Sequence, residues 1–278
     1  MTDPAGRNDA DAICHWWRTA IIDMAPGRIA FRGHPIQDLI GSVSFAQMIW
    51  LMVRGDMPTP EQAALFECAL VAGVDHGPQA PSIAAARMAA TCGLGLNNVI
   101  ATGVNMLGDV HGGAGEQAVA LYRRIERDWT EAVTLDAVVE AELDRFLADE
   151  NRYLPGFGHR FHPTDPRAPK LLGIVDAAAA RGTVSGRFAG IARALESALA
   201  ARKGKRIPMN IDGATAVIYA ELGFAPELAR GLFCLSRSVG ILAHAWEQQQ
   251  QGGRNKGPLP KEHTWAYEGI GHRPLPDD

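Results

Sequence analysis

Apolar residues recur every three or four positions along most of the chain, in segments rich in alanine and leucine. This spacing places them on one face of a helix, whereas the strict alternation typical of a half-buried strand is scarce. The fold is therefore expected to be all-α. Helices are predicted in residues 36–54 (as two short helices), 59–74, 79–92, 115–127, 134–151, 169–180, 185–203 and 226–251.

Three of the apolar segments carry more specific signals. Ser44 is the expected N-cap of the second short helix, because a serine oxygen accepts hydrogen bonds from the N–H groups of a first helical turn. Pro226 suits the first turn of the last long helix, and Gly252 and Gly253 end it. Residues 94–110 are apolar on nearly every side, which predicts a buried central helix.

Composition and charge exclude several classes of protein. The chain has 278 residues, 47% hydrophobic and 21% charged, enough for one large core or two modest domains. A net charge of −4 leaves no basic field for nucleic acid or an anionic membrane. The N-terminus is polar and acidic, and no run approaches about 18 apolar residues, so a cytoplasmic location is expected.

The four cysteines are scattered at positions 14, 68, 92 and 234 and form no C-x-x-C pair. This pattern argues against a zinc site or a disulfide framework, so reduced, buried thiols and no metal are expected.

Four titratable residues lie in glycine- and proline-rich stretches at the ends of predicted helices, where loops often carry chemistry. They are His76 in GVDHGPQAP, His111 in GDVHGGAGEQA, His159 after PGFG, and Asp212 in IPMNIDGATA. Each has a simpler interpretation when taken alone. A loop histidine is more often a turn or capping residue, and an aspartate at a helix start is a preferred N-cap.

Two further features allow alternatives. HGGAGE could cradle a phosphate, but it lacks the Lys-Ser/Thr of a P-loop and a preceding strand. Arg237 could be an exposed charge, yet its neighbours in SRSVGILAHAW are so apolar that an unpaired guanidinium there would be unfavourable. It requires an anionic partner.

Taken in order, the motifs of this chain resemble those of the citrate synthase superfamily from about residue 32 to about residue 256. RGHPIQDLI is followed by DHGP, VHGGAGE, PGFGHRFHPTDPRA, NIDG and SRSVGILAHAWEQ at compatible spacings. The periodicity and the resemblance together imply a large helical domain of residues 1–112 and 220–278, and a small helical domain of residues 113–219 that closes over the ligand.

The resemblance also implies catalytic roles. Asp212 matches the carboxylate that removes a proton from the methyl group of an acyl-CoA thioester. His111 matches the histidine that donates to the thioester oxygen as it becomes an enolate, and a histidine at a helix N-terminus tends to stay neutral. His159 matches the residue that protonates the ketone oxygen in condensation, or takes the hydroxyl proton in cleavage.

Binding roles follow from the same comparison of motifs. His76, Arg167 and Arg237 match the residues that bind carboxylates, a task for which arginine suits by bidentate hydrogen bonding. Prolines in the 155–167 loop stiffen it, and its glycines let the backbone approach a flat ligand. Contacts with coenzyme A are expected from Phe157, Gly158, Asn210, Lys203 and Lys205. The basic run that contains the two lysines and Arg206 is otherwise a solvated helix end.

This chain departs from the common synthase pattern in two ways. It is much shorter, close to the size of free-standing citryl-CoA lyases, and its DHGP motif resembles the lyase module of ATP-citrate lyase. The family pattern N-K-x-x-R-P appears as NKGPLP, so Leu259 replaces an arginine that reaches a partner subunit's carboxylate site. Arg254 or Arg273 could supply that contact, or the ligand could be a monocarboxylic oxo acid such as pyruvate.

The expected function is cleavage of citryl-CoA, or a close analogue, into acetyl-CoA and a 2-oxo acid such as oxaloacetate. The alternatives are a citrate or 2-methylcitrate synthase and a silent CoA-binding regulatory subunit. A homodimer or an even multiple of one is expected, since the family builds its site across a two-fold interface and the helices at 79–110 and 226–247 are more apolar than one small core requires.

Overall fold

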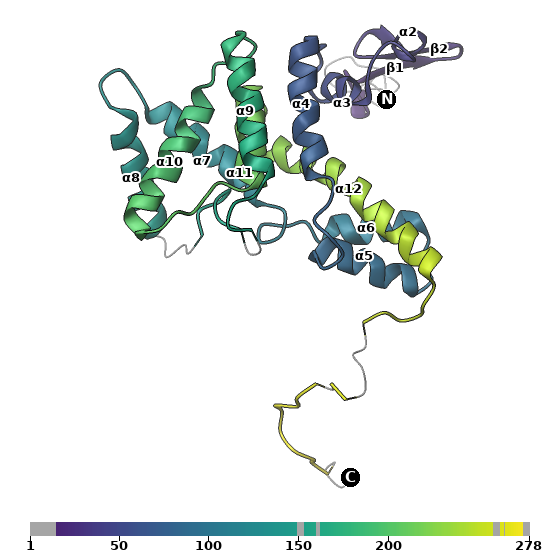
Figure 1. Cartoon of the computed structure of the whole chain (residues 1–278). Coiled ribbons are helices and arrows are strands. Elements are labelled where there is room, and N and C mark those ends of the chain that lie inside the picture. Colours follow the sequence, from purple (N-terminus) through teal and green to yellow (C-terminus); the bar gives the residue numbers. More distant parts are fainter. Residues whose placement is uncertain (1–14, 149–152, 160–161, 258–261, 264, 275–278) are drawn as a thin grey trace, which may run out of the picture. The chain divides into compact units, whose positions relative to one another are not determined.

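The computed structural model describes residues 15–148, 153–159, 162–257, 262–263 and 265–274 (Figure 1). The chain divides into two compact units. Unit 1 consists of Met1–Gly73 and Gly112–Phe233, and unit 2 consists of Val74–His111 and Cys234–Asp278. The described residues are mainly helical, which confirms the expected all-α class.

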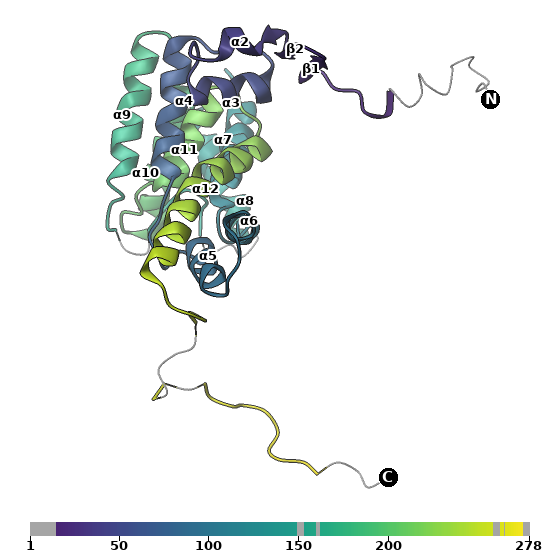
Figure 2. The same cartoon turned by 90° about the vertical axis from the view of Figure 1, so that its right-hand side faces the viewer.

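Unit 1 is a helical bundle built around one buried helix, α11 (Ile211–Glu221). Nine of the eleven residues of α11 are buried, so the helix is in contact with protein on all sides. The helices packed against it are α4 (Pro60–Gly73), α7 (Ala114–Asp128), α9 (Arg167–Ala180) and α10 (Arg187–Lys203). The helix α8 (Leu135–Ala148) packs against α7 and α10. The bundle can be followed in Figure 2, in which α9, α4 and α11 run side by side.

Aromatic rings close one end of this bundle. Trp50 lies edge-on to Phe66 and Phe224, with centroid distances of 5.8 and 5.0 Å, and Phe224 also meets Tyr219 edge-on at 6.1 Å. Such edge-to-face pairs add to the stability that burial of the rings provides. They tie α3 (Phe45–Arg54), which carries Trp50, to α4 and α11.

The ends of several helices agree with their sequence signals. The Oγ of Ser44 accepts from the N–H of Gln47, and the Gln47 side chain accepts from the N–H of Ser44, which forms a capping box at the start of α3. The short helix α2 (Ile36–Leu39) precedes it. The last helix, α12 (Pro226–Gln251), begins at the predicted proline and ends before the predicted glycines.

A small antiparallel sheet near the N-terminus was not expected from the sequence. It consists of β1 (Ile22–Ala25), β2 (Arg28–Phe31) and β3 (His34–Pro35) in that order. Pro26 and Gly27 connect β1 and β2, and Gly27 has a φ of +77°, which glycine adopts readily. Strands of four residues show too little alternation for the pattern to be recognised.

Unit 2 contains α5 (Pro81–Thr91), α6 (Leu96–Asn105) and the part of α12 that follows Phe233. Ile83, Val99 and Ile241, one from each helix, are fully buried in its core. Gly103 allows a close approach, because a Cβ there would lie 2.8 Å from the Cγ2 of Ile241.

The prediction of a buried central helix at 94–110 was wrong. Among the residues of α6 only Val99 and Gly103 are buried, and the helix ends before Met106. Positions 97, 98, 102 and 105 are Asn, Asn, Thr and Asn, so α6 has a polar face that the average hydrophobicity of the segment obscured.

Two other expectations can be compared with the structure. Cys68, Cys92 and Cys234 are free, but Cys92 is exposed and the other two are only half-buried, so the prediction of buried thiols was wrong for these three. Cys14 lies outside the described residues. The division into domains at 112/113 and 219/220 stays a prediction; the units found here are divided at 73/74, 111/112 and 233/234. No helix among the described residues is long and apolar enough to span a bilayer.

Candidate active site

In unit 1, the PGFG segment pairs with the residues that precede α11. Gly158 N–H donates to the Pro208 carbonyl at 2.8 Å, and Asn210 N–H donates to the Gly156 carbonyl at 2.9 Å. The Asn210 amide also donates through Nδ2 to the Gly158 carbonyl at 2.7 Å. The two segments therefore form a short antiparallel bridge, with Phe157 opposite Met209.

Two glycines make this pairing possible. A Cβ on Gly156 would lie 2.6 Å from the Cα of Gly213, and Gly156 has a φ of +85°. A Cβ on Gly213 would in turn collide with the Gly156 carbonyl oxygen. The loop backbone consequently lies directly on the first turn of α11, where Asp212 is located.

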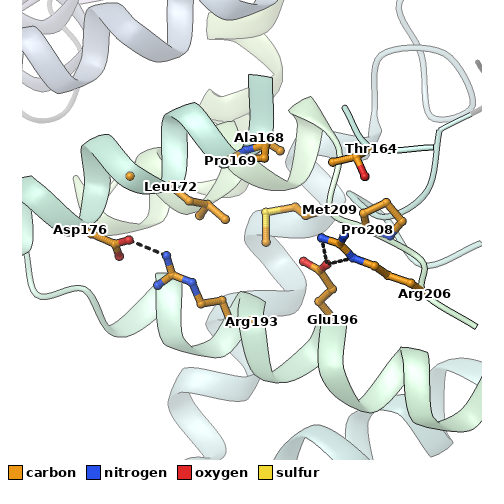
Figure 3. A pocket seen from close by; sticks show the side chains of 11 residues that line it. Thr164, Ala168, Pro169, Leu172, Asp176, Arg193, Glu196, Arg206, Pro208 and Met209 are labelled. Atoms are coloured by element: carbon orange, nitrogen blue, oxygen red, sulfur yellow. Dashed lines mark hydrogen bonds and ion pairs between the residues drawn. The ribbon is translucent and has the colours of Figure 1, made fainter. Parts of the chain in front are cut away.

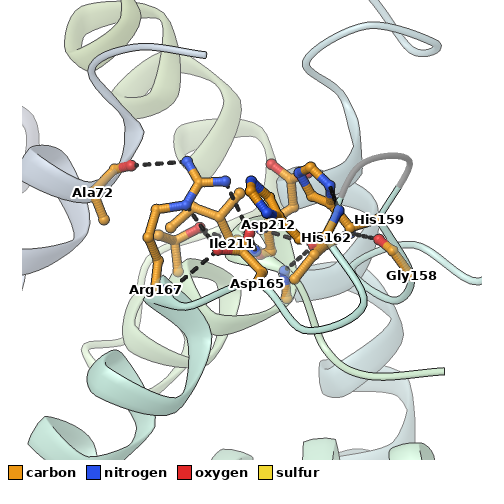
Figure 4. Close-up of polar contacts among 11 residues, drawn as sticks. Ala72, Gly158, His159, His162, Asp165, Arg167, Ile211 and Asp212 are labelled. Atoms are coloured by element: carbon orange, nitrogen blue, oxygen red, sulfur yellow. Dashed lines mark hydrogen bonds and ion pairs between the residues drawn. The ribbon is translucent and has the colours of Figure 1, made fainter. Parts of the chain in front are cut away.

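Asp212 does not cap this helix, so the simpler interpretation of it was wrong. The N-cap is Asn210, whose Oδ1 accepts from the N–H groups of Asp212 and Gly213 at 3.0 and 3.3 Å. Asp212 is half-buried in the first turn, where the helix dipole favours an ionised carboxylate. Figure 4 shows its side chain close to those of His159, His162 and Asp165.

Asp165 joins the loop to α11 and was not singled out by the sequence. It is fully buried, and one oxygen accepts from the Ile211 N–H at 3.0 Å. Arg167 donates to both of its oxygens, through Nε at 2.9 Å and Nη2 at 2.8 Å (Figure 4). Burial alone would raise the pKa of Asp165, but the hydrogen bonds from Arg167 and Ile211 outweigh burial and hold this pKa below its ordinary value.

The same contacts fix the orientation of the Arg167 side chain. Two of its nitrogens serve Asp165, and Nη1 lies 3.5 Å from the Ala72 carbonyl oxygen. The Arg167 side chain keeps 26% of its surface exposed. Its role as a carboxylate binder stays a prediction, and Asp165 fixes the orientation from which it would act.

Replacement of Asp165 by asparagine is expected to lower the free energy of unfolding by about 2–4 kcal/mol at pH 7, because an amide N–H would face the Arg167 and Ile211 donors. The folded pKa of Asp165 is depressed, so its contribution is present above the ordinary pKa of about 3.9 and is lost as pH falls through the folded value. Urea unfolding of both proteins from pH 7 to pH 3 measures this.

The control is Asp176→Asn, which breaks a pair with Arg193 whose two side chains are about half exposed (53% and 46%). A loss below about 0.5 kcal/mol is expected there. Equal losses for the two variants would contradict the assigned role of Asp165.

The tautomer of His159 follows from one hydrogen bond. The backbone N–H of His162 donates to His159 Nδ1 at 3.1 Å, so Nδ1 carries a lone pair and the proton of the neutral ring is on Nε2. The two rings lie 4.6 Å apart. Burial lowers the pKa of His159, and the charges of His162 and Arg167 lower it further against the opposing effect of Asp165. His159 is therefore a neutral Nε2–H donor.

In unit 2, His111 is held in the opposite tautomer. The N–H of Ser82, in the first turn of α5, donates to His111 Nε2 at 3.2 Å. The α5 N-cap residue, Ala80, has no capping side chain, so His111 satisfies one of the free N–H groups at this terminus. The Nδ1 of the neutral ring then carries the proton.

The pKa of His111 is lowered by burial, and by the positive charge of Arg237. Both effects favour the neutral ring, and the helix terminus that His111 contacts is that of α5 and not of the helix that follows His111 in sequence. Arg237 itself is buried, with 4% of its surface exposed, and His76 is exposed in the loop before α5.

The residues predicted to contact coenzyme A lie in unit 1. The Phe157 ring is buried in the core, so a ligand contact would have to come from its backbone, and the Asn210 amide already holds the loop and caps α11. Lys203 and Lys205 are exposed. These binding roles stay predictions.

A cavity of about 290 Å³ lies beside this region (Figure 3). Pro208 and Met209 form one side, and Leu172 of α9 forms another. Its two arginines are paired, Arg193 with Asp176 at 2.7 Å and Arg206 with Glu196 at 3.4 Å. The cavity thus combines an apolar wall with charges at its edges, a common composition for a ligand site.

The structure brings the predicted site residues together in two sets. His159, Arg167 and Asp212 gather in unit 1 around Asp165, and His111 and Arg237 interact electrostatically in unit 2. No group of three or more metal-ligating side chains occurs among the described residues.

Comparison with known protein families shows to which family this chain belongs. The family described as "Citrate synthase, C-terminal domain" matches residues 10–73 and 52–258. The chain belongs to the citrate synthase family. Curated relatives include the citrate synthase of Acidithiobacillus ferridurans, 30% identical over 76% of this chain and 53% of its own, and that of Deinococcus radiodurans, 31% identical over 72% and 51%. The chain spans about half the length of these relatives.

Solved structures of the citrate synthase family show the same fold. Citryl-CoA lyase from Hydrogenobacter thermophilus superposes with a TM-score of 0.81 and 32% identity, covering 94% of this chain and 97% of that one. Citrate synthase from Thermoplasma acidophilum, in a ternary complex with carboxymethyl coenzyme A and oxaloacetate, gives a TM-score of 0.65 and 27% identity, covering 82% and 59%. The citrate synthase-like all-α fold is therefore confirmed.

The position that departs from the family's C-terminal pattern, Leu259, lies outside the described residues. Arg254 and Arg273, the two candidates to replace the missing arginine, are exposed. Sequence reasoning missed Ser82 and Asp165, which orient His111 and Arg167. An aspartate two residues before an arginine signals a local turn, whereas nothing in the sequence connects Ser82 with a histidine 29 positions away.

Proposed function

We propose that this chain cleaves citryl-CoA, or a close analogue, into acetyl-CoA and a 2-oxo acid such as oxaloacetate. The observation that carries the proposal is the match, over nearly the full length of both chains, with a structure described as citryl-CoA lyase. The synthases that resemble this chain are about twice as long as the matched region.

The chemistry assigned to His111 is stabilisation of negative charge on the thioester oxygen. Its Nδ1–H can donate to this oxygen while Nε2 stays bonded to Ser82. A neutral donor suits this role, since a neutral imidazole is not acidic enough to give its proton away and remains a hydrogen-bond donor throughout.

Asp212 carries the proton transfer to carbon in this proposal. In cleavage, the bond between the hydroxyl-bearing carbon and the acetyl methylene breaks, and its electron pair forms the enolate of acetyl-CoA. Asp212, which takes up a proton from solvent before cleavage, then gives this proton to the enolate carbon, which becomes the methyl group, and is left as the carboxylate. In condensation the same carboxylate removes that proton.

His159 is assigned to the oxygen of the other reactant. The observed Nε2–H tautomer suits donation to a ketone oxygen, as condensation requires. In cleavage His159 must accept the hydroxyl proton on Nε2, and this requires the His162 N–H to leave Nδ1. The loop from 155 to 167 would therefore change its hydrogen bonding during a cleavage cycle.

Substrate binding completes the proposal. We assign the carboxylates of the oxo acid to His76, Arg167 and Arg237, and coenzyme A to the region of Phe157, Gly158, Lys203, Lys205 and Asn210. The cavity beside Met209 adjoins this region and supports the second assignment.

A homodimer is also part of the proposal. Within unit 2, four large apolar residues of α12 are exposed at spacings of four, three and four, namely Leu235 (49%), Val239 (58%), Leu242 (40%) and Trp246 (54%). They form one stripe along the helix, which we call the α12 stripe. A stripe of this size suits a second copy of the chain. The cytoplasmic location stays a prediction.

Synthase activity is the second candidate, and it is favoured by the curated relatives and by the observed tautomer of His159. Two incubations separate the candidates. Citryl-CoA alone is expected to give acetyl-CoA and oxaloacetate, whereas a synthase would turn acetyl-CoA and oxaloacetate into free CoA and citrate. A silent CoA-binding subunit would bind CoA and do neither.

A further inference from the structure

A buried arginine in unit 2 has no part in the reaction just proposed. Arg87 lies in α5 with 7% of its surface exposed. A cation so far from water is unfavourable unless it is paired and hydrogen-bonded. Its nitrogens contact three side chains of α12, Glu247 Oε2 at 2.6 Å, Gln251 Oε1 at 2.7 Å and His244 Nδ1 at 3.1 Å.

The contact with Arg87 sets the tautomer of His244. A guanidinium can only donate, so His244 Nδ1 is the acceptor and the ring proton is on Nε2. Nε2 lies 3.2 Å from Asp75 Oδ1. The ring therefore lies between Arg87, from which Nδ1 accepts a hydrogen bond, and the Asp75 carboxylate, which Nε2 meets at ion-pair distance.

Asp75 in turn holds the backbone directly after His76. Its Oδ2 accepts from the Gly77 N–H at 3.1 Å, and the backbone of His76 lies near enough to lower the pKa of the carboxylate. Burial alone would raise the pKa of Asp75, but these backbone groups and His244 together lower it, so the carboxylate stays ionised.

Gly240 gives this arrangement its space. A Cβ at Gly240 would lie 3.1 Å from Asp75 Oδ1 and would collide with the Val74 carbonyl oxygen. The absence of a side chain allows the 74–77 turn to rest on α12 one helical turn before His244. Gly77 completes the turn with a φ of +83°.

We infer that Arg87, His244 and Asp75 form a positioning chain for His76, with His244 as its central link. The inference rests on the proposed function, in which His76 binds a carboxylate of the oxo acid. None of the three residues is assigned a contact with the substrate. They act by fixing the backbone that carries His76, and a misplacement of about 1 Å can change a rate about 100-fold.

The first test needs no substrate. In His244→Phe, which fills the same space without polar atoms, the amides of His76 and Gly77 are expected to exchange with deuterated water at least about tenfold faster, because the ring that holds the Asp75 carboxylate at ion-pair distance is lost. The matched control is His34→Phe, at an exposed position of β3 in unit 1, which should leave this exchange unchanged. Unchanged exchange in His244→Phe would overturn the inference.

The second test uses kinetics and a double-mutant cycle. His244→Phe and His76→Ala are each expected to raise the KM for citryl-CoA about tenfold with a smaller change in kcat, and the double variant should be no worse than His76→Ala alone. If the two increases in KM multiplied in the double variant, the inference would be overturned, since His244 would then act independently of His76.

The outcomes separate this inference from the proposed function. Suppose that His76→Ala leaves the KM unchanged while amide exchange of His76 and Gly77 responds to His244→Phe. The positioning chain then holds the turn as inferred, but the proposal that His76 binds a carboxylate of the substrate fails. If His244→Phe does not fold, Asp75→Asn removes the same link with little change in shape, and the same two expectations apply to it.

Discussion

Replacement of Asp212 by asparagine is expected to lower the turnover of citryl-CoA at least about 100-fold, the scale typical of losing a general acid or base. Asparagine keeps the shape but cannot carry a proton to the enolate carbon. Folding should be little affected, because Asn210 and not Asp212 caps α11. The loss of a charge from a first helical turn changes the free energy of unfolding by only about 0.3–1 kcal/mol.

Single-turnover kinetics and CoA binding by calorimetry measure this effect. Affinity for CoA should stay within about threefold, since Asp212 serves chemistry and not ground-state binding. The control is Asp136→Asn, an exposed aspartate in the first turn of α8, which removes the same kind of charge and should leave turnover unchanged. An Asp212→Asn protein that turned over at the wild-type rate would refute the assignment of the proton transfer.

Replacement of Trp246 by glutamate should convert the protein into monomers and remove most of its activity. Trp246 is 54% exposed at the end of the α12 stripe, and buried tryptophans at interfaces often contribute about 2–4 kcal/mol each. An unpaired carboxylate in an apolar interface adds a further penalty. Together these effects should weaken the dimer at least about 1,000-fold.

Sedimentation velocity at micromolar concentration measures the change. The control is Trp17→Glu, because Trp17 is a tryptophan of unit 1 that is 81% exposed and is not part of the stripe. If the wild-type protein is a dimer, as proposed, the Trp17→Glu variant should sediment as a dimer too. A wild-type protein that sediments as a monomer, or a Trp246→Glu protein that stays dimeric, would show that the stripe serves another purpose.

The helices could be predicted where local chemistry determines them. Ser44 caps α3, and Pro226 and Gly252 bound α12, because capping and ring geometry depend on neighbouring residues alone. The β1–β2 hairpin was missed because four-residue strands leave too short a pattern, although Pro26-Gly27 is a recognisable turn signal.

The sequence predicted which residues form the candidate site, but not the contacts that hold their side chains in place. The sequence motifs alone identify His111, His159 and Asp212 as candidates. The groups that determine the tautomer or orientation of these residues can come from elsewhere in the chain. The Ser82 N–H, for example, determines the tautomer of His111. The capping role of Asn210 was likewise invisible, because Asp212 is an equally good cap by type. The contact between Ser82 and His111 is tertiary and depends on packing, which local sequence does not encode.

Cleavage of citryl-CoA in deuterated water tests the central claim most directly. The carboxyl group of Asp212 exchanges its proton with solvent, so each turnover should place one deuterium in the methyl group of acetyl-CoA, with one oxaloacetate formed per acetyl-CoA. Mass spectrometry of the acetyl-CoA and an enzymatic assay of oxaloacetate measure both. Singly deuterated acetyl-CoA in equal amount to oxaloacetate is the predicted result. Free CoA and citrate as the products, or intact citryl-CoA, would contradict the account.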